Sequence, residues 1–214
     1  MQSPLDRRVW IAILVLCAIG AAAAARRIVA IANTPSTAAS DLARLDQHFR
    51  AKTGVTLLHI VPSLLFVLLL PLQFVGSLRY RRPRLHRWSG RVIMFLGVVL
   101  GLSAVWLSAH PVGGLAEGTA TIFFGCVFLF CLGKAWWHIR SKRVELHREW
   151  VTRMTAIALG VATTRPIMGV FFATSRLTGL TPEQFFGPAM WLGLVSTYLA
   201  GEAWINYTRT SEAV

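Results

Sequence analysis

Six long apolar runs constrain the fold of this chain more than any other feature of its sequence. A hydrocarbon core about 30 Å thick needs about 20 helical residues at 1.5 Å each, and the runs approach or exceed that length. Backbone polar groups find no water inside a bilayer, so each run is expected to be a helix. The runs are Val9 to about Ala25, Thr53–Gly76, Trp88–Ala109, about Gly118–His138, Trp150 to about Ser175 and about Pro188–Tyr207.

The composition favours a membrane protein over a soluble one. Of the 214 residues, 55% are hydrophobic and 14% are charged, whereas a soluble domain carries roughly 25% charged residues. The predicted fold class is all-α, a polytopic helix bundle forming one membrane domain over residues 1–214. The net charge of +13 does not predict nucleic-acid binding, because no polar domain is present to form such a surface. The expected partner is instead a bilayer with anionic headgroups at its cytoplasmic face.

The distribution of Lys and Arg predicts the orientation. The segments 79–87 and 139–149 are rich in both residues, whereas 110–117 has neither and 176–187 has only Arg176. By the positive-inside rule the two basic segments are cytoplasmic, and six spans then place both termini in the cytoplasm. Some cations oppose this assignment because they fall on the predicted outer side. They are Arg26, Arg27, Arg44, Arg50 and Lys52.

The expected layout has four parts. They are an N-terminal span at 1–32, an external loop at 33–52, a five-helix core at 53–207 and a short cytoplasmic tail at 208–214. The first run ends in alanines, which makes a cleaved signal peptide the alternative to a retained helix. Apolar character resumes at Ile28, which favours retention. A short helix is expected after Ser40, a good N-cap, and breaks are expected at Pro62, Pro71 and Arg165-Pro166.

A His-Arg segment occurs twice, at the predicted cytoplasmic ends of two spans. The first reads Leu85-His86-Arg87-Trp88-Ser89-Gly90-Arg91, and the second reads Leu146-His147-Arg148-Glu149-Trp150-Val151-Thr152-Arg153. Each has Leu-His-Arg, then a Trp within one helical turn, then an Arg inside the next apolar run. The sequence therefore predicts paired His-Arg sites at one membrane face.

These segments also carry a resemblance to a known family. The following occur in the order typical of the bacterial membrane family called domain of unknown function 2306: His59, Pro71-Leu72-Gln73-Phe74, Arg79, Arg84 to Arg91, Gly113-Gly114, His147 to Arg153 and Thr164-Arg165. The resemblance covers about Gly54 to Glu202. It implies a multi-pass protein of the bacterial inner membrane, and it brings no activity with it.

Ionisable residues inside the predicted spans are the functional candidates, because burying a charge in a bilayer is costly. His59 lies about 10 Å inside the outer end of its run and Arg165 about 8 Å from the outer face, so the two are expected to share a layer. His110 and Glu117 lie above them. The inner candidates include Glu202, which is expected to pair with Arg153 or Arg91. The inner group is His86, Arg91, Lys134, His138, His147, Arg153 and Glu202, and Arg87 and Arg148 of the two His-Arg segments are further candidates.

Three functions fit these residues. The first is binding or transport of a small anionic, lipidic or redox ligand between helices, with the His-Arg segments forming a cationic inner mouth and Arg165-Pro166 lining a cavity. The first alternative is electron transfer by a b-type haem whose iron is bound by His86 and His147, with the neighbouring arginines holding the propionates. Against it, both histidines lie at helix starts and are followed at once by Arg.

The second alternative is an enzyme acting on a lipid or quinone, although no G-x-S-x-G or H-E-x-x-H motif is present. Beside all three stands a purely structural interpretation. In it, the His-Arg side chains reach toward headgroups, and tryptophans such as Trp88 and Trp150 lie at the membrane interface without a further role.

Overall fold

The computed structural model describes residues 6–33 and 41–212, and within them every regular element is a helix. Five helices of this described part are long and apolar enough to cross a membrane. The predicted all-α polytopic fold is confirmed; the orientation of the termini stays a prediction. The chain divides into two compact units, residues 1–100 and residues 101–214, which are described in turn.

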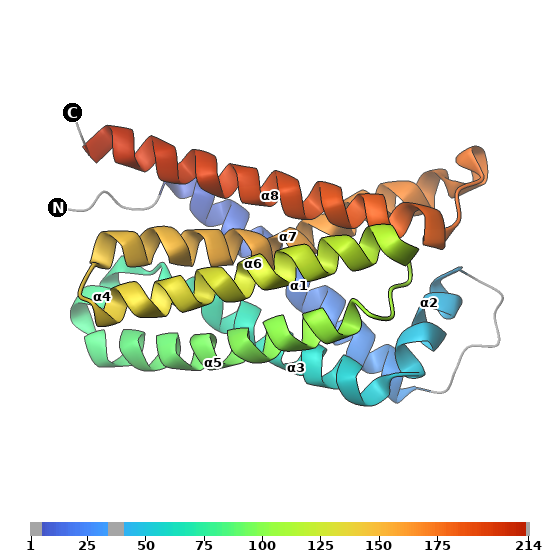
Figure 1. Cartoon of the computed structure of the whole chain (residues 1–214), viewed down its shortest axis with the longest axis horizontal. Helices are drawn as coiled ribbons and strands as arrows, with labels where there is room; N and C mark the ends of the chain where they lie inside the picture. The colour runs from blue at the N-terminus through green and yellow to red at the C-terminus, as the bar shows by residue number, and fades with distance from the viewer. Residues whose placement is uncertain (1–5, 34–40, 213–214) are drawn as a thin grey trace. The chain divides into compact units, whose positions relative to one another are not determined.

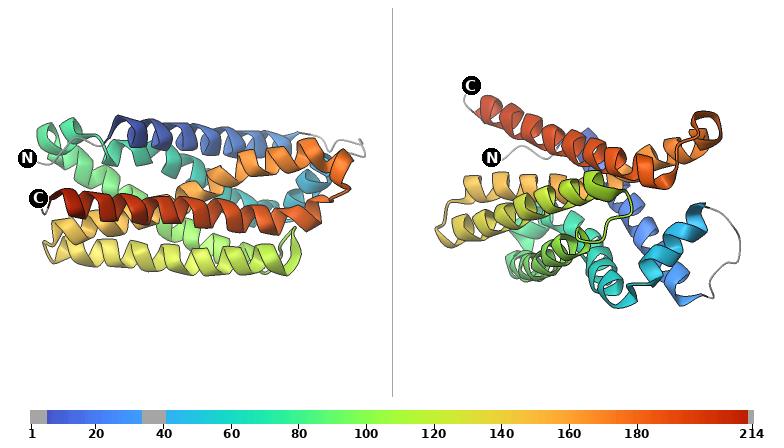
Figure 2. Two further views of the ribbon diagram at one scale, coloured as in Figure 1. Left: turned by 90° about the horizontal axis from the view of Figure 1, so that it is seen from above. Right: turned by 45° about the vertical axis from the view of Figure 1, so that its right-hand side comes forward.

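The first unit is built around two apolar helices, α1 and α3, that lie side by side (Figure 2). Its elements are α1 (Arg7–Ala32), α2 (Asp41–Arg50), α3 (Thr53–Leu69), the 3-10 helix η1 (Leu70–Gln73), α4 (Gly76–Arg81) and the first part of α5 (Pro83–Leu107). The expected break at Pro62 is wrong, because α3 continues through it. At Pro71 the α-helix has given way to η1, as a residue without an N–H favours.

Helix α2 falls inside the expected external loop and is tied to the end of α1. Its Asp46 carboxylate receives the Arg26 guanidinium at 2.8 Å and also pairs with Arg27. The Arg27 guanidinium lies 4.1 Å from the centroid of the Phe49 ring. Ser40, the expected N-cap, lies outside the described residues.

The Arg50 side chain, at the end of α2, makes a further contact between α2 and the end of α1. It donates hydrogen bonds to the backbone carbonyls of Ala30 and Asn33, at the C-terminal end of α1. A cation is favourable there, because the carbonyls of a last helical turn carry partial negative charge. Three of the cations that oppose the predicted topology thus have local partners that offset their charge.

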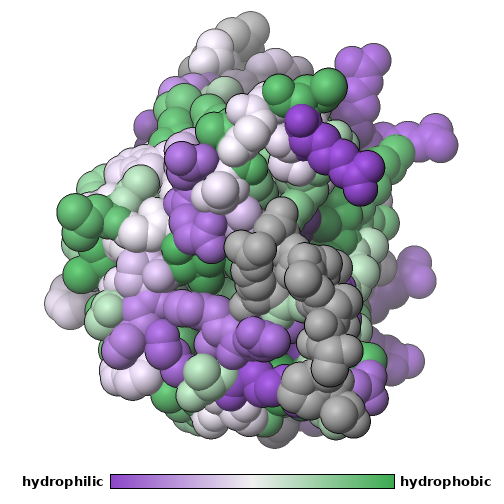
Figure 3. Space-filling model, turned by 90° about the vertical axis from the view of Figure 1, so that its right-hand side faces the viewer, coloured by the Kyte–Doolittle hydropathy of each residue, from purple (hydrophilic) through white to green (hydrophobic). Residues whose placement is uncertain are grey.

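The second unit contains three long helices that lie side by side (Figure 1). They are α6 (Gly114–Arg140), α7 (Val144–Thr178) and α8 (Pro182–Glu212), joined by the last part of α5. The turn between α6 and α7 places Lys142 in the left-handed region at φ 58°. Figure 3 views the end where α6 and α8 begin and α7 ends, and hydrophilic residues are interspersed there with hydrophobic ones.

Small residues let α7 and α8 approach closely. A Cβ atom added to Gly193 would lie 2.5 Å from Thr164 Cγ2, and one added to Gly201 would lie 2.8 Å from Ala156 Cβ. Close backbone approach is how helices gain packing energy in a bilayer, where no hydrophobic effect drives them together. The Thr197 hydroxyl of α8 also donates a hydrogen bond to Thr163 Oγ1 of α7 at 2.8 Å.

Three expectations about helix ends need correction. Helix α7 runs unbroken through Arg165-Pro166, since a single proline removes only one ladder hydrogen bond and packing against α8 supports the rest. Helix α5 begins at Pro83, so His86 and Arg87 are helical. Helix α8 continues to Glu212 and therefore takes in most of the expected tail. Although α8 has 31 residues, it is not among the five apolar spans, and its crossing of the membrane stays a prediction.

Candidate functional site

The two His-Arg segments occupy equivalent local positions. His86 is the fourth residue of α5, and His147 is the fourth residue of α7. The expectation that both histidines lie at helix starts is confirmed. His86 belongs to the first unit and His147 to the second, so a site shared by the two stays a prediction.

In the first unit, the His-Arg segment packs locally against η1. Gln73 donates a hydrogen bond from Nε2 to the Ser89 hydroxyl at 2.8 Å. A Cβ atom at Gly90 would lie 3.2 Å from the Gln73 Oε1 atom. The Ser-Gly pair therefore accommodates the glutamine side chain, while Arg87 and Arg91 on the same helix are exposed.

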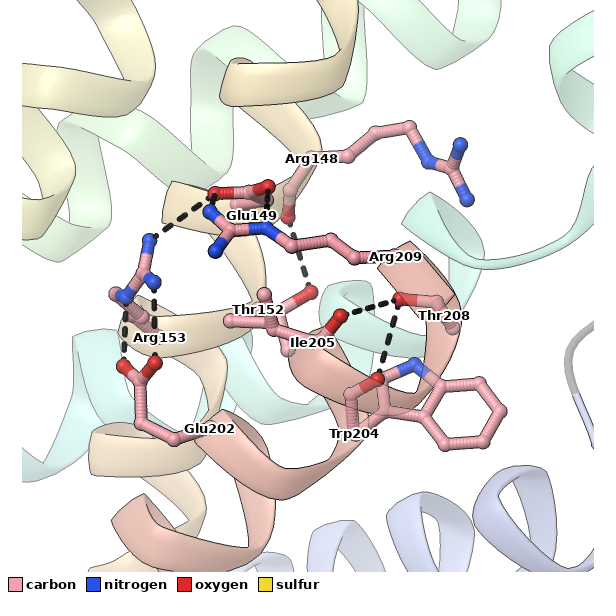
Figure 4. Close-up of polar contacts among 9 residues, drawn as sticks. All are labelled: Arg148, Glu149, Thr152, Arg153, Glu202, Trp204, Ile205, Thr208 and Arg209. Atoms are coloured by element: carbon pink, nitrogen blue, oxygen red, sulfur yellow. Dashed lines mark hydrogen bonds and ion pairs between the residues drawn. The ribbon is translucent and has the colours of Figure 1, made fainter. Parts of the chain in front are cut away.

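In the second unit, four alternating charges form an ion-pair ladder between α7 and α8, shown in Figure 4. Arg153 donates to Glu202 twice, from Nε to Oε1 at 2.6 Å and from Nη2 to Oε2 at 3.0 Å. Arg209 donates from Nε to Glu149 Oε1 at 2.6 Å and makes a second contact to the other oxygen. The Arg153 Nη1 atom lies 3.5 Å from Glu149 Oε2 and links the two pairs. The predicted pairing of Glu202 with Arg153 is confirmed.

The ladder balances its own charges. Its two guanidinium groups face its two carboxylates, and the inner side chains are mostly buried, with Arg153 13% exposed and Glu149 17% exposed. Two-pronged Arg–carboxylate contacts are the strongest ion pairs available to side chains. Arg153 is thus engaged with carboxylates on both neighbouring sides, and this geometry favours holding α7 to α8 over binding an external anion.

The imidazole of His147 faces α6. Its Nδ1 atom lies 2.8 Å from the backbone carbonyl oxygen of Ala135, a distance at which an Nδ1–H donates a hydrogen bond and fixes the ring. His138 lies one turn further along α6 and is 6% exposed. In the described part of the chain its Nδ1 atom has no hydrogen-bond partner.

The Trp150 ring, one turn after His147, is surrounded by two cations and an aromatic ring. The Lys134 ammonium lies 5.6 Å from its centroid and the Arg153 guanidinium 4.7 Å from it. The Phe130 ring meets it edge-on at 5.5 Å. Beside this cluster is the α6 groove, an open and shallow groove on the surface of α6. The groove is lined by Phe130, Gly133, Lys134 and Trp137.

The expected outer group is only partly brought together. Arg165 of α7 is exposed and interacts electrostatically with Glu117 of α6, whose Oε2 accepts a hydrogen bond from the Gly113 N–H at 2.7 Å. The His110 ring lies 5.1 Å from the Trp106 ring. His59 belongs to α3 of the first unit, so its shared layer with Arg165 stays a prediction.

Comparison with known proteins identifies the family. A family model described as "Predicted membrane protein (DUF2306)" matches residues 56–205. The chain belongs to this family. No curated protein and no solved structure gives a significant match to the chain. The resemblance expected from the His-Arg segments is confirmed, and the protein is an integral membrane protein with several apolar helices.

The DUF2306 match contains both His-Arg segments, the α6 groove and three members of the ladder, and it ends before Arg209. Sequence reasoning missed Glu149 and Arg209 as partners, although the spacing of Glu149 and Arg153 is a recognised helical ion-pair signal. It also missed the hollow beside Lys134. Within the described residues of this DUF2306 protein, no group of three or more His, Cys, Asp or Glu side chains is placed to hold a metal ion.

Proposed function

We propose that this DUF2306 protein binds an anionic amphiphile, a molecule with a hydrocarbon part and an anionic group, in the α6 groove. The observation that carries the proposal is a lysine that lines an open groove with two aromatic rings on an apolar span. The ligand's anionic group would meet the Lys134 ammonium, and its hydrocarbon part would lie along Phe130 and Trp137.

Charge supports this assignment. The four ladder residues neutralise one another, whereas no carboxylate among the described side chains forms an ion pair with Lys134. Lys134 lies six residues before the end of α6 at Arg140, a rise of about 9 Å into the span. A cation at that depth is costly without a counter-ion, and an anionic ligand offsets the cost.

Shape supports it as well. Phe130 is 58% exposed and Trp137 is 66% exposed, so both rings are open to a neighbouring hydrocarbon chain. Between them, Gly133 contributes no side chain, and a Cβ atom added there would meet nothing within 4 Å. All four lining residues belong to α6, so the groove is a shallow one on the surface of a single helix.

Membrane location fits such a ligand. The groove lies near the predicted cytoplasmic ends of the spans, beside the basic segment that begins at Arg140. Cytoplasmic leaflets are rich in anionic lipid, and Lys and Arg near the surface attract it. We propose that the protein lies in the bacterial inner membrane, where phospholipids and other phosphate-bearing amphiphiles are available as ligands.

The test compares two lipids that differ in headgroup charge. Short-chain phosphatidylglycerol and phosphatidylcholine of equal chain length are titrated into the detergent-purified full chain by calorimetry. Phosphatidylglycerol is expected to bind about tenfold more tightly, the value of one charge-assisted contact. Lys134→Gln should abolish the preference, and Gly133→Leu should remove binding of both lipids by filling the groove.

Matched controls sharpen the experiment. Gly169 of α7 also has open space at its Cβ position, so Gly169→Leu adds the same volume away from the groove. Arg176→Gln removes a cation in the last turn of α7 that does not line the groove. Both controls should bind like the unmodified protein. Equal affinity for the two lipids, or unchanged binding in Lys134→Gln, would overturn the proposed function.

One observation favours b-type haem binding as a second candidate. A hydrogen bond from one ring nitrogen to a backbone carbonyl is how proteins commonly orient an imidazole that binds a metal, and His147 makes such a contact with Ala135. Absorption spectra of the purified protein, oxidised and then reduced after growth with haem precursor, decide the matter. A Soret band that shifts on reduction and is lost in His147→Ala would support haem; a featureless spectrum would remove it.

A further inference from the structure

We infer that Trp150 is the positioning residue of the α6 groove, an inference that rests on the proposed function. Trp150 does not line the groove itself. It contacts two residues that do, Phe130 and Lys134, and it also contacts Arg153 of the ladder. The ring is therefore the direct link between the ion-pair ladder and the cation of the groove.

The side chain that needs positioning is Lys134. A lysine ends in a compact cation on a flexible four-carbon stem, and it loses much rotamer freedom when it binds an anion. The negative face of an indole ring attracts an ammonium group within about 6 Å. With its ammonium 5.6 Å from the Trp150 centroid, Lys134 is held at the groove before any ligand arrives, which lowers the entropic cost of binding.

The ring is itself held firmly. Arg153, 4.7 Å from the ring centroid, is fixed by hydrogen bonds to Glu202 and an ion pair to Glu149. On the same helix His147, three residues earlier, contacts the α6 backbone. Residues three apart lie on one side of a helix, so His147 and Trp150 both set the register of α7 against α6. Trp150 would thus have a role in addition to its expected position at the membrane interface.

The test is a double-mutant cycle on phosphatidylglycerol affinity, measured as described for the proposed function. Trp150→Leu should weaken binding about tenfold by removing the ring face. Trp150→Phe keeps a ring face and should stay within about twofold of the unmodified protein. In the Lys134→Gln background, Trp150→Leu should have no further effect, because Trp150 acts through Lys134.

Trp88→Leu is the matched control. Trp88 is the tryptophan of the first His-Arg segment and is 67% exposed, so its replacement should leave the affinity unchanged. A second readout is the rate at which Lys134 reacts with an acylating reagent, followed by mass spectrometry. That rate should rise in Trp150→Leu and not in Trp150→Phe, since the ammonium is released from the ring.

The outcomes separate the two proposals. If the unmodified protein shows no preference for phosphatidylglycerol, the proposed function fails and the inference fails with it. If Lys134→Gln loses the preference while Trp150→Leu keeps it, the function stands and the positioning role is overturned. Additive losses in the double variant would likewise overturn it, because they would show that Trp150 and Lys134 act independently.

Discussion

Replacing Arg153 with methionine is expected to destabilise the second unit more than replacing Arg209 does. Arg153 makes two hydrogen bonds to Glu202 and an ion pair with Glu149. Methionine keeps much of the side-chain length and removes the charge. Glu149 would retain its two contacts to Arg209, whereas Glu202 would lose its cation.

The magnitude follows from burial. Removing one partner of a fully buried pair costs about 3–5 kcal/mol, and an exposed pair contributes about 0–1 kcal/mol. The Arg153 side chain is 13% exposed and that of Glu202 is 26% exposed, which places Arg153→Met between these limits at about 2–3 kcal/mol. Arg209 is 55% exposed, and water screens its pair, so Arg209→Met should cost clearly less.

The assay is equilibrium unfolding in mixed micelles, with denaturing detergent added stepwise and helicity followed by circular dichroism. A third variant combines Arg153→Met with Glu202→Leu. It should recover part of the stability lost in Arg153→Met, because it removes the uncompensated carboxylate. An equal loss of stability in Arg209→Met and Arg153→Met, or a double variant less stable than Arg153→Met, would contradict this expectation.

Three further predictions concern the packing of α7 against α8, the attachment of α2 to α1, and the membrane topology. Gly193→Val should destabilise the protein by about 1–3 kcal/mol, because a Cβ atom there meets α7 within 2.8 Å; Gly169→Val, at an open position, should be nearly neutral in the same unfolding assay. Asp46→Asn should speed limited proteolysis between α1 and α3, because Asp46 pairs with two arginines of α1. An unchanged cleavage rate would show that these ion pairs do not hold α2 to α1. A cysteine introduced at Lys142, with the native cysteines replaced, should react with an impermeant thiol reagent only in inside-out vesicles, and labelling in intact cells would invert the predicted orientation.

Counting along the helices predicted that Glu202 pairs with Arg153 or Arg91, and the structure shows the pair with Arg153. Both residues lie about the same distance from the predicted cytoplasmic face, on helices that run in opposite directions. A charge buried in a bilayer is costly unless it has a nearby partner of opposite charge. The pair Glu149–Arg209 was not predicted, because Arg209 was placed in a tail. Helix α8 in fact extends to Glu212, so Arg209 is helical and its guanidinium contacts Glu149 of α7.

Hydropathy and the order of motifs can be read along the chain without knowing its fold, so the amino-acid sequence predicted five of the apolar helices, the two His-Arg segments and the family. Most side-chain neighbours, by contrast, are known only from how the helices pack. In the second unit, helix packing places carboxylates on both sides of Arg153, and it places the Lys134 ammonium 5.6 Å from the centroid of the Trp150 ring. Ion pairs and ring contacts between helices depend on the rotation and register of packed helices. These are set by close contacts such as that of Gly193 with Thr164 and not by the apolar pattern of any single helix.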